Sequence, residues 1–78
     1  YIVAPNPVSS VSELIFDNDN QEQVTITVFN ERGEVVHEMT TSEQSVSINR
    51  EKYKQGVYFF VMKSEGALES FSGKFSVI

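Results

Sequence analysis

The longest unbroken apolar stretch of the chain is Val-Tyr-Phe-Phe-Val-Met, which lies between Gly56 and Lys63. β-Branched and aromatic residues bounded by a glycine and a charged residue are typical of a strand, and the stretch is too short to cross a bilayer as a helix. We therefore expect a central strand over residues 56 to 63 and no membrane insertion. Because successive side chains of a strand point to opposite faces, an uninterrupted apolar run predicts cover on both faces by a second sheet.

A strict alternation of apolar and polar residues precedes that stretch, over residues 23 to 30. Val or Ile occupies every second position from 24 to 28, which predicts a strand with one face toward the core. Gly33 closes a polar turn after it, because glycine adopts positive φ at little cost. Residues 34 to 39 are expected to return as the partner strand, so the pattern predicts a β-hairpin.

Shorter patterns predict the rest of the fold. Further strands are expected at residues 1 to 4, 12 to 16, 45 to 48 and 68 to 78, the last with a bulge at Gly73. Turns are expected at residues 17 to 20, 40 to 44 and 64 to 67. A single helical turn is expected at residues 49 to 55, where Tyr53 plugs the edge of the core. About seven short strands at roughly eight- to twelve-residue spacing predict an all-β fold, a small immunoglobulin-like antiparallel β-sandwich.

Composition limits the size of the core and the kind of partner. A chain of 78 residues has room for one domain, residues 1 to 78, and its 40% hydrophobic content supplies one core. The absence of cysteine excludes disulfides and thiolate metal sites. A net charge of -5 without a basic cluster disfavours a nucleic acid or an anionic membrane as partner. Since the chain begins at Tyr1 without a methionine, we interpret it as a segment of a longer protein.

Candidate catalytic groups are few, since His37 is the single histidine and no cysteine is present. Nucleophilic catalysis needs a nucleophile, a base and an orienting group within reach of one another. Alternation places His37 on the face of its strand opposite Val36, and we interpret it as a surface histidine rather than a catalytic base. We expect no enzyme activity and no cofactor.

Oxygen-bearing side chains crowd one loop, namely those of Asp17, Asp19, Asn20 and Glu22. Such loops hold calcium in some proteins, but the EF-hand pattern needs a glycine at its sixth position and a glutamate at its twelfth. Counted from Asp17, those positions hold Glu22 and Val28. We therefore expect a solvated turn, with a weak calcium site as the alternative.

Four short elements occur in a recognisable order along the chain. A Pro-Asn-Pro motif follows the first apolar strand, a glycine closes the hairpin, Gly-Val-Tyr opens the central strand, and a basic-apolar Lys-Phe-Ser-Val-Ile segment comes last. Together, over residues 5 to 78, they resemble the C-terminal sorting domain, type A, of the bacterial type IX secretion system. The residues that carry the resemblance are Pro5, Asn6, Pro7, Gly33, Gly56, Tyr58, Lys74, Phe75, Val77 and Ile78.

The resemblance implies a C-terminal secretion signal that directs a secreted cargo protein across the outer membrane of Bacteroidetes-type bacteria. In that family, the domain folds in the periplasm, is recognised by the outer-membrane translocon and a shuttle protein, and is usually removed by a sortase. The implied location is the periplasm in transit, then the cell surface or the extracellular space. The domain is then a substrate of the machinery and not an enzyme, and its removal is expected before or near Tyr1.

The last segment is the expected recognition element. We expect residues 74 to 78 to form an exposed sheet edge whose unpaired backbone groups accept a strand from a partner. Deleting them is expected to block export while most of the fold survives, and the same edge predicts an edge-strand dimer with a second copy. Truncation of Tyr58 is expected to be strongly destabilising if its ring is buried, and weakly so if the ring is exposed for recognition.

One departure from the family pattern lies between residues 47 and 55, where many members carry a leucine and Tyr53 is expected to take its place. An alternative function is a permanently retained immunoglobulin-like interaction or carbohydrate-binding module of a surface protein. The sequence separates the two functions poorly, because a retained module uses the same strands. The fate of the domain in the mature protein separates them.

Overall fold

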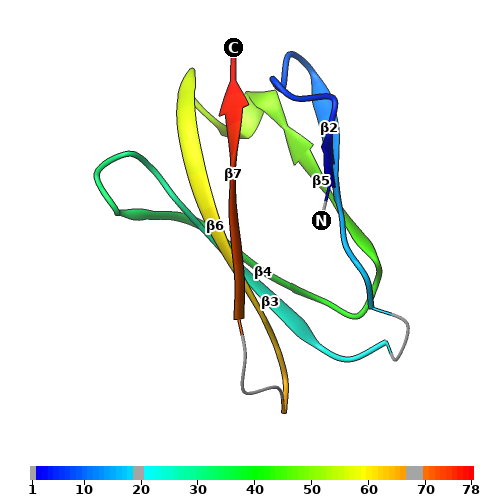
Figure 1. Ribbon diagram of the computed structural model, residues 1–78. Coiled ribbons are helices and arrows are strands. Elements are labelled where there is room, and N and C mark those ends of the chain that lie inside the picture. Colours follow the sequence, from blue (N-terminus) through cyan, green and yellow to red (C-terminus); the bar gives the residue numbers. More distant parts are fainter. Residues whose placement is uncertain (1, 19–20, 67–69) are drawn as a thin grey trace.

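The computed structural model describes residues 2 to 18, 21 to 66 and 70 to 78, and Figure 1 shows its two layers of strands. The first sheet has the order β1-β2-β5 and consists of β1 (Ile2–Ala4), β2 (Val11–Ile15) and β5 (Ser45–Asn49). The second has the order β4-β3-β6-β7 and consists of β3 (Val24–Phe29), β4 (Val35–Thr41), β6 (Gly56–Ser64) and β7 (Ser70–Val77). Neighbouring strands run antiparallel in both sheets. The predicted all-β, immunoglobulin-like sandwich of about seven strands is confirmed.

The core lies between the two sheets and follows the alternation of the sequence. Val24, Ile26 and Val28 of β3 are buried, whereas the residues between them are half-buried on the outer face. Burial of apolar surface, worth about 25 cal/mol per Å², is the main force that holds two such sheets together. The buried apolar side chains of the core are those of Val8, Leu14, Phe16, Val24, Ile26, Val28, Ile48, Tyr53, Tyr58, Phe60, Met62, Phe75 and Val77.

β6 alternates between core and solvent, so the expectation that both of its faces are covered is wrong. Tyr58, Phe60 and Met62 are buried, while Phe59 is 45% exposed on the other face. The register explains the unbroken apolar run, because Phe59 lies directly opposite Phe29 of β3. Cross-strand aromatic pairs stabilise a sheet on a face that meets solvent as well. The run therefore reflects pairing within one sheet rather than burial between two layers.

The β3–β4 hairpin has the predicted turn. Gly33 has φ +82°, and its N–H donates to the carbonyl oxygen of Asn30 at 3.0 Å. The side-chain oxygen of Asn30 accepts two further bonds, from the N–H groups of Arg32 and Glu34. Asparagine favours turns because its side chain bonds the backbone of the residues that follow. Gly33 is therefore a structural residue of this hairpin.

His37 is half-buried on the inner side of β4, and its interpretation as a surface histidine is wrong. It pairs with the buried Val28, and its ring meets the ring of Tyr53 edge-on, with 6.2 Å between the centroids. A register shift at the end of β3 leaves Val36 44% exposed, so the apolar neighbour faces solvent and the histidine faces the core. His37 and Val36 lie on opposite faces of β4, as expected, but the bulge places His37 rather than Val36 on the face toward the core.

Asn18 organises the loop after β2. Its side chain is buried, and its amide N–H groups donate to the carbonyl oxygens of Glu22, Ser42 and Glu43 at 3.0, 3.1 and 3.0 Å. The loop is thereby tied to the turn between β4 and β5. Among the described residues, no group of three or more His, Cys, Asp or Glu side chains is arranged to hold a metal ion. Asp19 and Asn20, on which part of the calcium alternative depends, lie outside the described residues.

The expected helical turn is present as η1 (Arg50–Lys52), a 3₁₀ turn capped by the side chain of Asn49, and Tyr53 after it is buried as predicted. The bulge expected at Gly73 is wrong, because the register of β7 against β6 is unbroken and Gly73 lies opposite the fully buried Phe60. The expectations at residues 1, 67 and 68 fall outside the described residues.

Candidate recognition surface at the end of β7

The Pro-Asn-Pro motif lies against the end of β7, although 70 residues separate the two in sequence. The side-chain oxygen of Asn6 accepts a hydrogen bond from the N–H of Ser76 at 3.1 Å. Val8 pairs in parallel with Val77: its N–H donates to the carbonyl oxygen of Ser76 at 2.7 Å, and its own carbonyl oxygen accepts from the N–H of Ile78 at 3.0 Å. We call residues 6 to 8 the edge-capping segment, because they occupy the outer edge of β7 at this end.

The two prolines determine how this segment is held. Proline has no N–H to donate, so Pro5 and Pro7 take part in the fold without joining a strand ladder. Both are exposed, and both follow a cis peptide bond. The hydroxyl of the buried Ser12 donates to the carbonyl oxygen of Pro5. The motif is therefore anchored by a buried hydroxyl on one side and by Asn6 on the other, and it presents its proline rings to solvent.

The Gly-Val-Tyr motif lies on the other side of the same end of β7. Gly56 pairs with Val77, and Tyr58 pairs with Phe75. Gly56 has φ +155°, a backbone conformation that favours glycine, and a Cβ atom there would be in ordinary contact with the carboxylate oxygen Oε1 of Glu31, at 3.4 Å. The same Glu31 oxygen accepts a hydrogen bond from the N–H of Val57 at 3.2 Å. Through Glu31, the hairpin turn that Gly33 closes is connected to the start of β6.

Tyr58 is a core residue, with its ring 6% exposed. The ring stacks on Phe75 at 5.6 Å between centroids and meets Tyr53 edge-on at 5.1 Å. Its hydroxyl donates to the carbonyl oxygen of Lys54 at 2.7 Å, which satisfies the polar end of a buried tyrosine. Burial, and secondarily the neighbouring Tyr58, raises the pKa of Tyr53 above its usual value. Tyr58 therefore supports the surface from within and is not itself presented to a partner.

The last segment is divided between core and surface. Phe75 and Val77 are each 1% exposed, whereas Lys74 is exposed and Ile78 is 51% exposed. The expectation that residues 74 to 78 form a detachable exposed element is therefore wrong, because alternation in β7 places every second side chain in the core. The residues Pro5, Pro7, Lys74 and Ile78 at this end are exposed. We call these four residues the capped end.

Three residues that hold this end together, and Asn18 at the opposite end of the sandwich, carried no usable signal in the sequence. Val8 is fully buried, but a lone valine after a proline predicts nothing by itself. The Nε–H of Arg50 donates to the backbone oxygen of Ile78 at 2.5 Å, and no sequence rule pairs residues so far apart. Glu31 and Asn18 likewise depend on contacts that only the folded chain creates. Of the predicted site residues, Gly33 is the one set apart from the capped end, in the hairpin turn.

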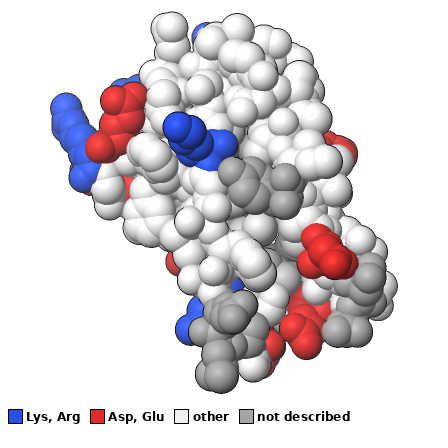
Figure 2. Space-filling model, viewed as in Figure 1, with Lys and Arg blue, Asp and Glu red and all other residues white. Residues whose placement is uncertain are grey.

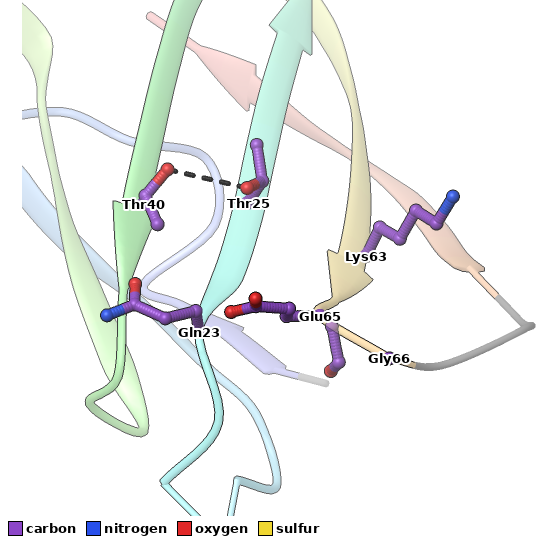
Figure 3. Close-up of a pocket in the computed structure, with 7 residues that line it drawn as sticks. Gln23, Thr25, Thr40, Lys63, Glu65 and Gly66 are labelled. Atoms are coloured by element: carbon purple, nitrogen blue, oxygen red, sulfur yellow. Dashed lines mark hydrogen bonds between the residues drawn. The ribbon is translucent and has the colours of Figure 1, made fainter.

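A second surface feature is a polar hollow of about 430 Å³ near the other end of β3 and β6. Figure 3 shows Thr25 and Thr40 joined by a hydrogen bond and Lys63 pointing away from them. None of the seven described residues that line it is aromatic. The hollow therefore offers hydrogen-bonding groups but no ring on which a sugar could stack.

The chain matches the family model described as secretion system C-terminal sorting domain over residues 2 to 77. It belongs to this family, and it is a C-terminal sorting signal of the type IX secretion system. Such a signal directs its cargo toward the cell surface or the extracellular space. None of the described segments forms a helix long and apolar enough to cross a membrane.

Among solved structures, the fold is similar to part of PorZ, described as an essential bacterial surface component of the type-IX secretion system of the human oral-microbiomic Porphyromonas gingivalis. The match has a TM-score of 0.77 and 16% sequence identity, and it covers 99% of this chain and 11% of the PorZ chain. A comparison with curated proteins gave no match. The PorZ match supports the sandwich fold, and the family match carries the function.

Proposed function

We propose that the type IX machinery recognises this domain in its folded state, through the capped end of β7. The observation that carries the proposal is the hydrogen bond between Asn6 and Ser76, supported by the pairing of Val8 with Val77. In an unfolded chain these residues are far apart, so a surface made of both motifs exists only after folding. Recognition of that surface lets cargo proteins of any sequence share one receptor.

The partners in this proposal are the outer-membrane translocon, a shuttle protein and a sortase. The domain folds in the periplasm of a Bacteroidetes-type bacterium, is delivered to the translocon, and is removed at the cell surface near residue 1. It acts as a substrate of these proteins and not as an enzyme. The half-burial of His37 against Tyr53 supports this, since a histidine engaged in packing is poorly placed for proton transfer to a substrate.

Export of a reporter fused ahead of the domain, in a bacterium with a type IX system, tests the proposal. Ile78→Ser changes an exposed apolar residue of the capped end, and Val35→Ser makes the same change at an exposed position on β4. We expect the first variant to lower the exported fraction of the reporter and the second to leave it unchanged. Phe60→Ala, which destabilises the fold, should also lower export. Normal export of Phe60→Ala at a temperature where that variant is unfolded would contradict recognition of the folded state.

A retained interaction or carbohydrate-binding module is the second candidate function, and the polar hollow at Gln23 is the feature that favours it. The hollow lacks an aromatic lining among its described residues, which weighs against sugar binding. Mass spectrometry of mature surface material separates the two functions. Peptides covering residues 23 to 32 should be absent if the domain is removed, and their persistence would favour the retained module.

A further inference from the structure

Among the residues that the structure describes, those that cover the outer edge of β7 do so at one end only. The N–H and carbonyl oxygen of Ser76 both point away from β6, toward Asn6 and Val8. Because these groups alternate direction along a strand, the backbone groups of Lys74, Ser72 and Ser70 also point away from β6. β7 is the last strand in its sheet, and the edge-capping segment ends at Val8. Residues 70 to 74 therefore form a free edge, ready to pair with an extended chain.

A pocket of about 260 Å³ opens beside this free edge. It is lined by Phe16, Asp17, Val24, Met62, Ser64 and Phe71. Phe71 lies opposite the buried Met62, so its ring points to the inner side of the sheet. Yet it is 64% exposed, more than any other large apolar side chain among the described residues. The exposed ring and the pocket together offer an apolar site for one side chain of a partner.

We propose that the free edge of β7 and the pocket beside Phe71 together bind an extended segment of a partner protein. The segment adds a strand to β7 along residues 70 to 74 and places one apolar side chain in the pocket, the usual division between backbone affinity and side-chain selectivity in strand addition. The capped end offers a precedent within the molecule, since Val8 already pairs with the same edge. This inference rests on the proposed recognition of the folded domain, and it adds that the partner contributes an extended segment with an apolar anchor residue.

The charges near this edge favour a segment of another protein over a second copy of this chain. Asp17 lines the pocket on the inner side of the sheet, whereas Lys63 and Lys74 pair with Thr25 and Phe59 and so lie on its outer face. Figure 2 shows both acidic and basic side chains at the lower end of the visible face. The chain as a whole carries a net charge of -5. A second copy would bring the same net negative charge to the interface. A segment with a basic residue two positions from its apolar anchor would place that residue on the same side of the sheet as Asp17, where it would be attracted. The partner segment is therefore basic as well as apolar.

Peptide binding to the complete 78-residue chain tests the site directly. The probe is a short synthetic peptide of alternating Thr and Val with a central Leu and a Lys at each end. Nuclear magnetic resonance should show slowed hydrogen exchange at the amides of Ser72 and Lys74 when the peptide binds. Replacing the central Leu by Asp, or each Lys by Glu, should weaken binding. Absence of binding, or exchange slowed by the protein's own concentration without peptide, overturns the proposal, the latter in favour of a second copy.

Two variants locate the site, and a third serves as a matched control. Phe71→Ser removes the ring at the pocket, and Ser72→Pro removes an N–H that points away from β6, so the ladder between β6 and β7 is kept. Each should weaken peptide binding by about tenfold or more. Phe59→Ser makes the same change as Phe71→Ser on the outer face of the sheet and should leave binding unchanged. Equal effects of Phe71→Ser and Phe59→Ser overturn the site.

Export of the same variants separates this proposal from the one it rests on. If the reporter fused to the unaltered domain is exported but Phe71→Ser and Ser72→Pro are exported equally well, the site at Phe71 fails while folded-state recognition stands. If Phe60→Ala is exported while unfolded, folded-state recognition fails, and the peptide measurement on the isolated chain still decides whether the edge binds a strand. Loss of export for Phe71→Ser and Ser72→Pro, with Phe59→Ser unaffected, supports the site at Phe71 and recognition of the folded state.

Discussion

The side-chain oxygen of Asn6 accepts a hydrogen bond from the backbone N–H of Ser76, and this contact joins the Pro-Asn-Pro motif to the last strand of the fold. It lies beside the parallel pairing of Val8 with Val77, so side chain and backbone hold the same edge. The motif that begins the domain is thus a structural cap for the strand that ends it. The two motifs form one surface.

Removing that cap should weaken the fold slightly. Because the bond between Asn6 and Ser76 is exposed and water replaces part of it, we expect Asn6→Ala to lower the free energy of unfolding by about 0.5 to 1.5 kcal/mol. Asn6→Asp keeps an acceptor oxygen and should lose less. Urea unfolding followed by circular dichroism measures both. Equal stability of Asn6→Ala and the unaltered chain would mean that Val8 holds the edge alone.

Deleting residues 74 to 78 should unfold the domain. The deletion removes the fully buried rings and methyl groups of Phe75 and Val77, and truncation of Phe75 alone is expected to cost about 3 to 5 kcal/mol. A domain of this kind has a total stability of about 5 to 15 kcal/mol. Ile78→Ala, at an exposed position, should stay within about 0.5 kcal/mol of the unaltered chain. A cooperative urea transition in the deletion variant would refute the assignment of these side chains to the core.

Two substitutions of Tyr58 separate the contribution of ring packing to stability from that of the hydrogen bond of its hydroxyl. Tyr58→Ala removes a ring stacked on Phe75 and should cost about 3 to 5 kcal/mol. Tyr58→Phe keeps the ring and removes only the bond to the carbonyl oxygen of Lys54, at a cost of about 1 kcal/mol. Both values come from urea unfolding. If the two variants were equally stable, the ring would contribute little and its burial would be in question.

Alkaline pH should destabilise the fold through Tyr53. Burial raises the pKa of its hydroxyl in the folded state above the value of 10.0 that it has in the unfolded chain. The stabilising contribution is therefore complete below pH 10 and is lost as the pH rises, because the unfolded state releases this proton more readily. Urea unfolding between pH 8 and pH 11 measures the effect. Tyr53→Phe should reduce the change in the free energy of unfolding over this pH range. An unchanged pH dependence would mean that another group causes it.

The sequence was sufficient for the parts of the fold that repeat a local pattern. The alternation at Val24, Ile26 and Val28 located a half-buried strand, and Gly33 located its turn, because both depend on residues close to one another. The error at β6 came from the same rule. An unbroken apolar run has two explanations, burial on both faces or aromatic pairing on an open face, and only the position of Phe29 beside Phe59 decides between them.

The sequence identified residues of the candidate surface, but it did not show which of them contact one another in the fold. The family pattern singled out Asn6 and the last strand, yet nothing local brings them together. Their contact depends on Val8, which is buried against β7, and on Arg50, which reaches the backbone of Ile78. The position of Phe71 could not be foreseen either, since its exposure depends on how far β6 and β7 extend beyond the smaller sheet.

The parallel pairing of Val8 with Val77 also determines how the domain bears mechanical load. A pull on the chain ahead of residue 2, resisted at residue 78, draws the two paired strands lengthwise past one another. The three hydrogen bonds that join Asn6 and Val8 to Ser76 and Ile78 are then strained together rather than opened one after another. A pull transmitted to this junction therefore loads the three bonds at once, so the edge-capping segment separates from β7 in one step.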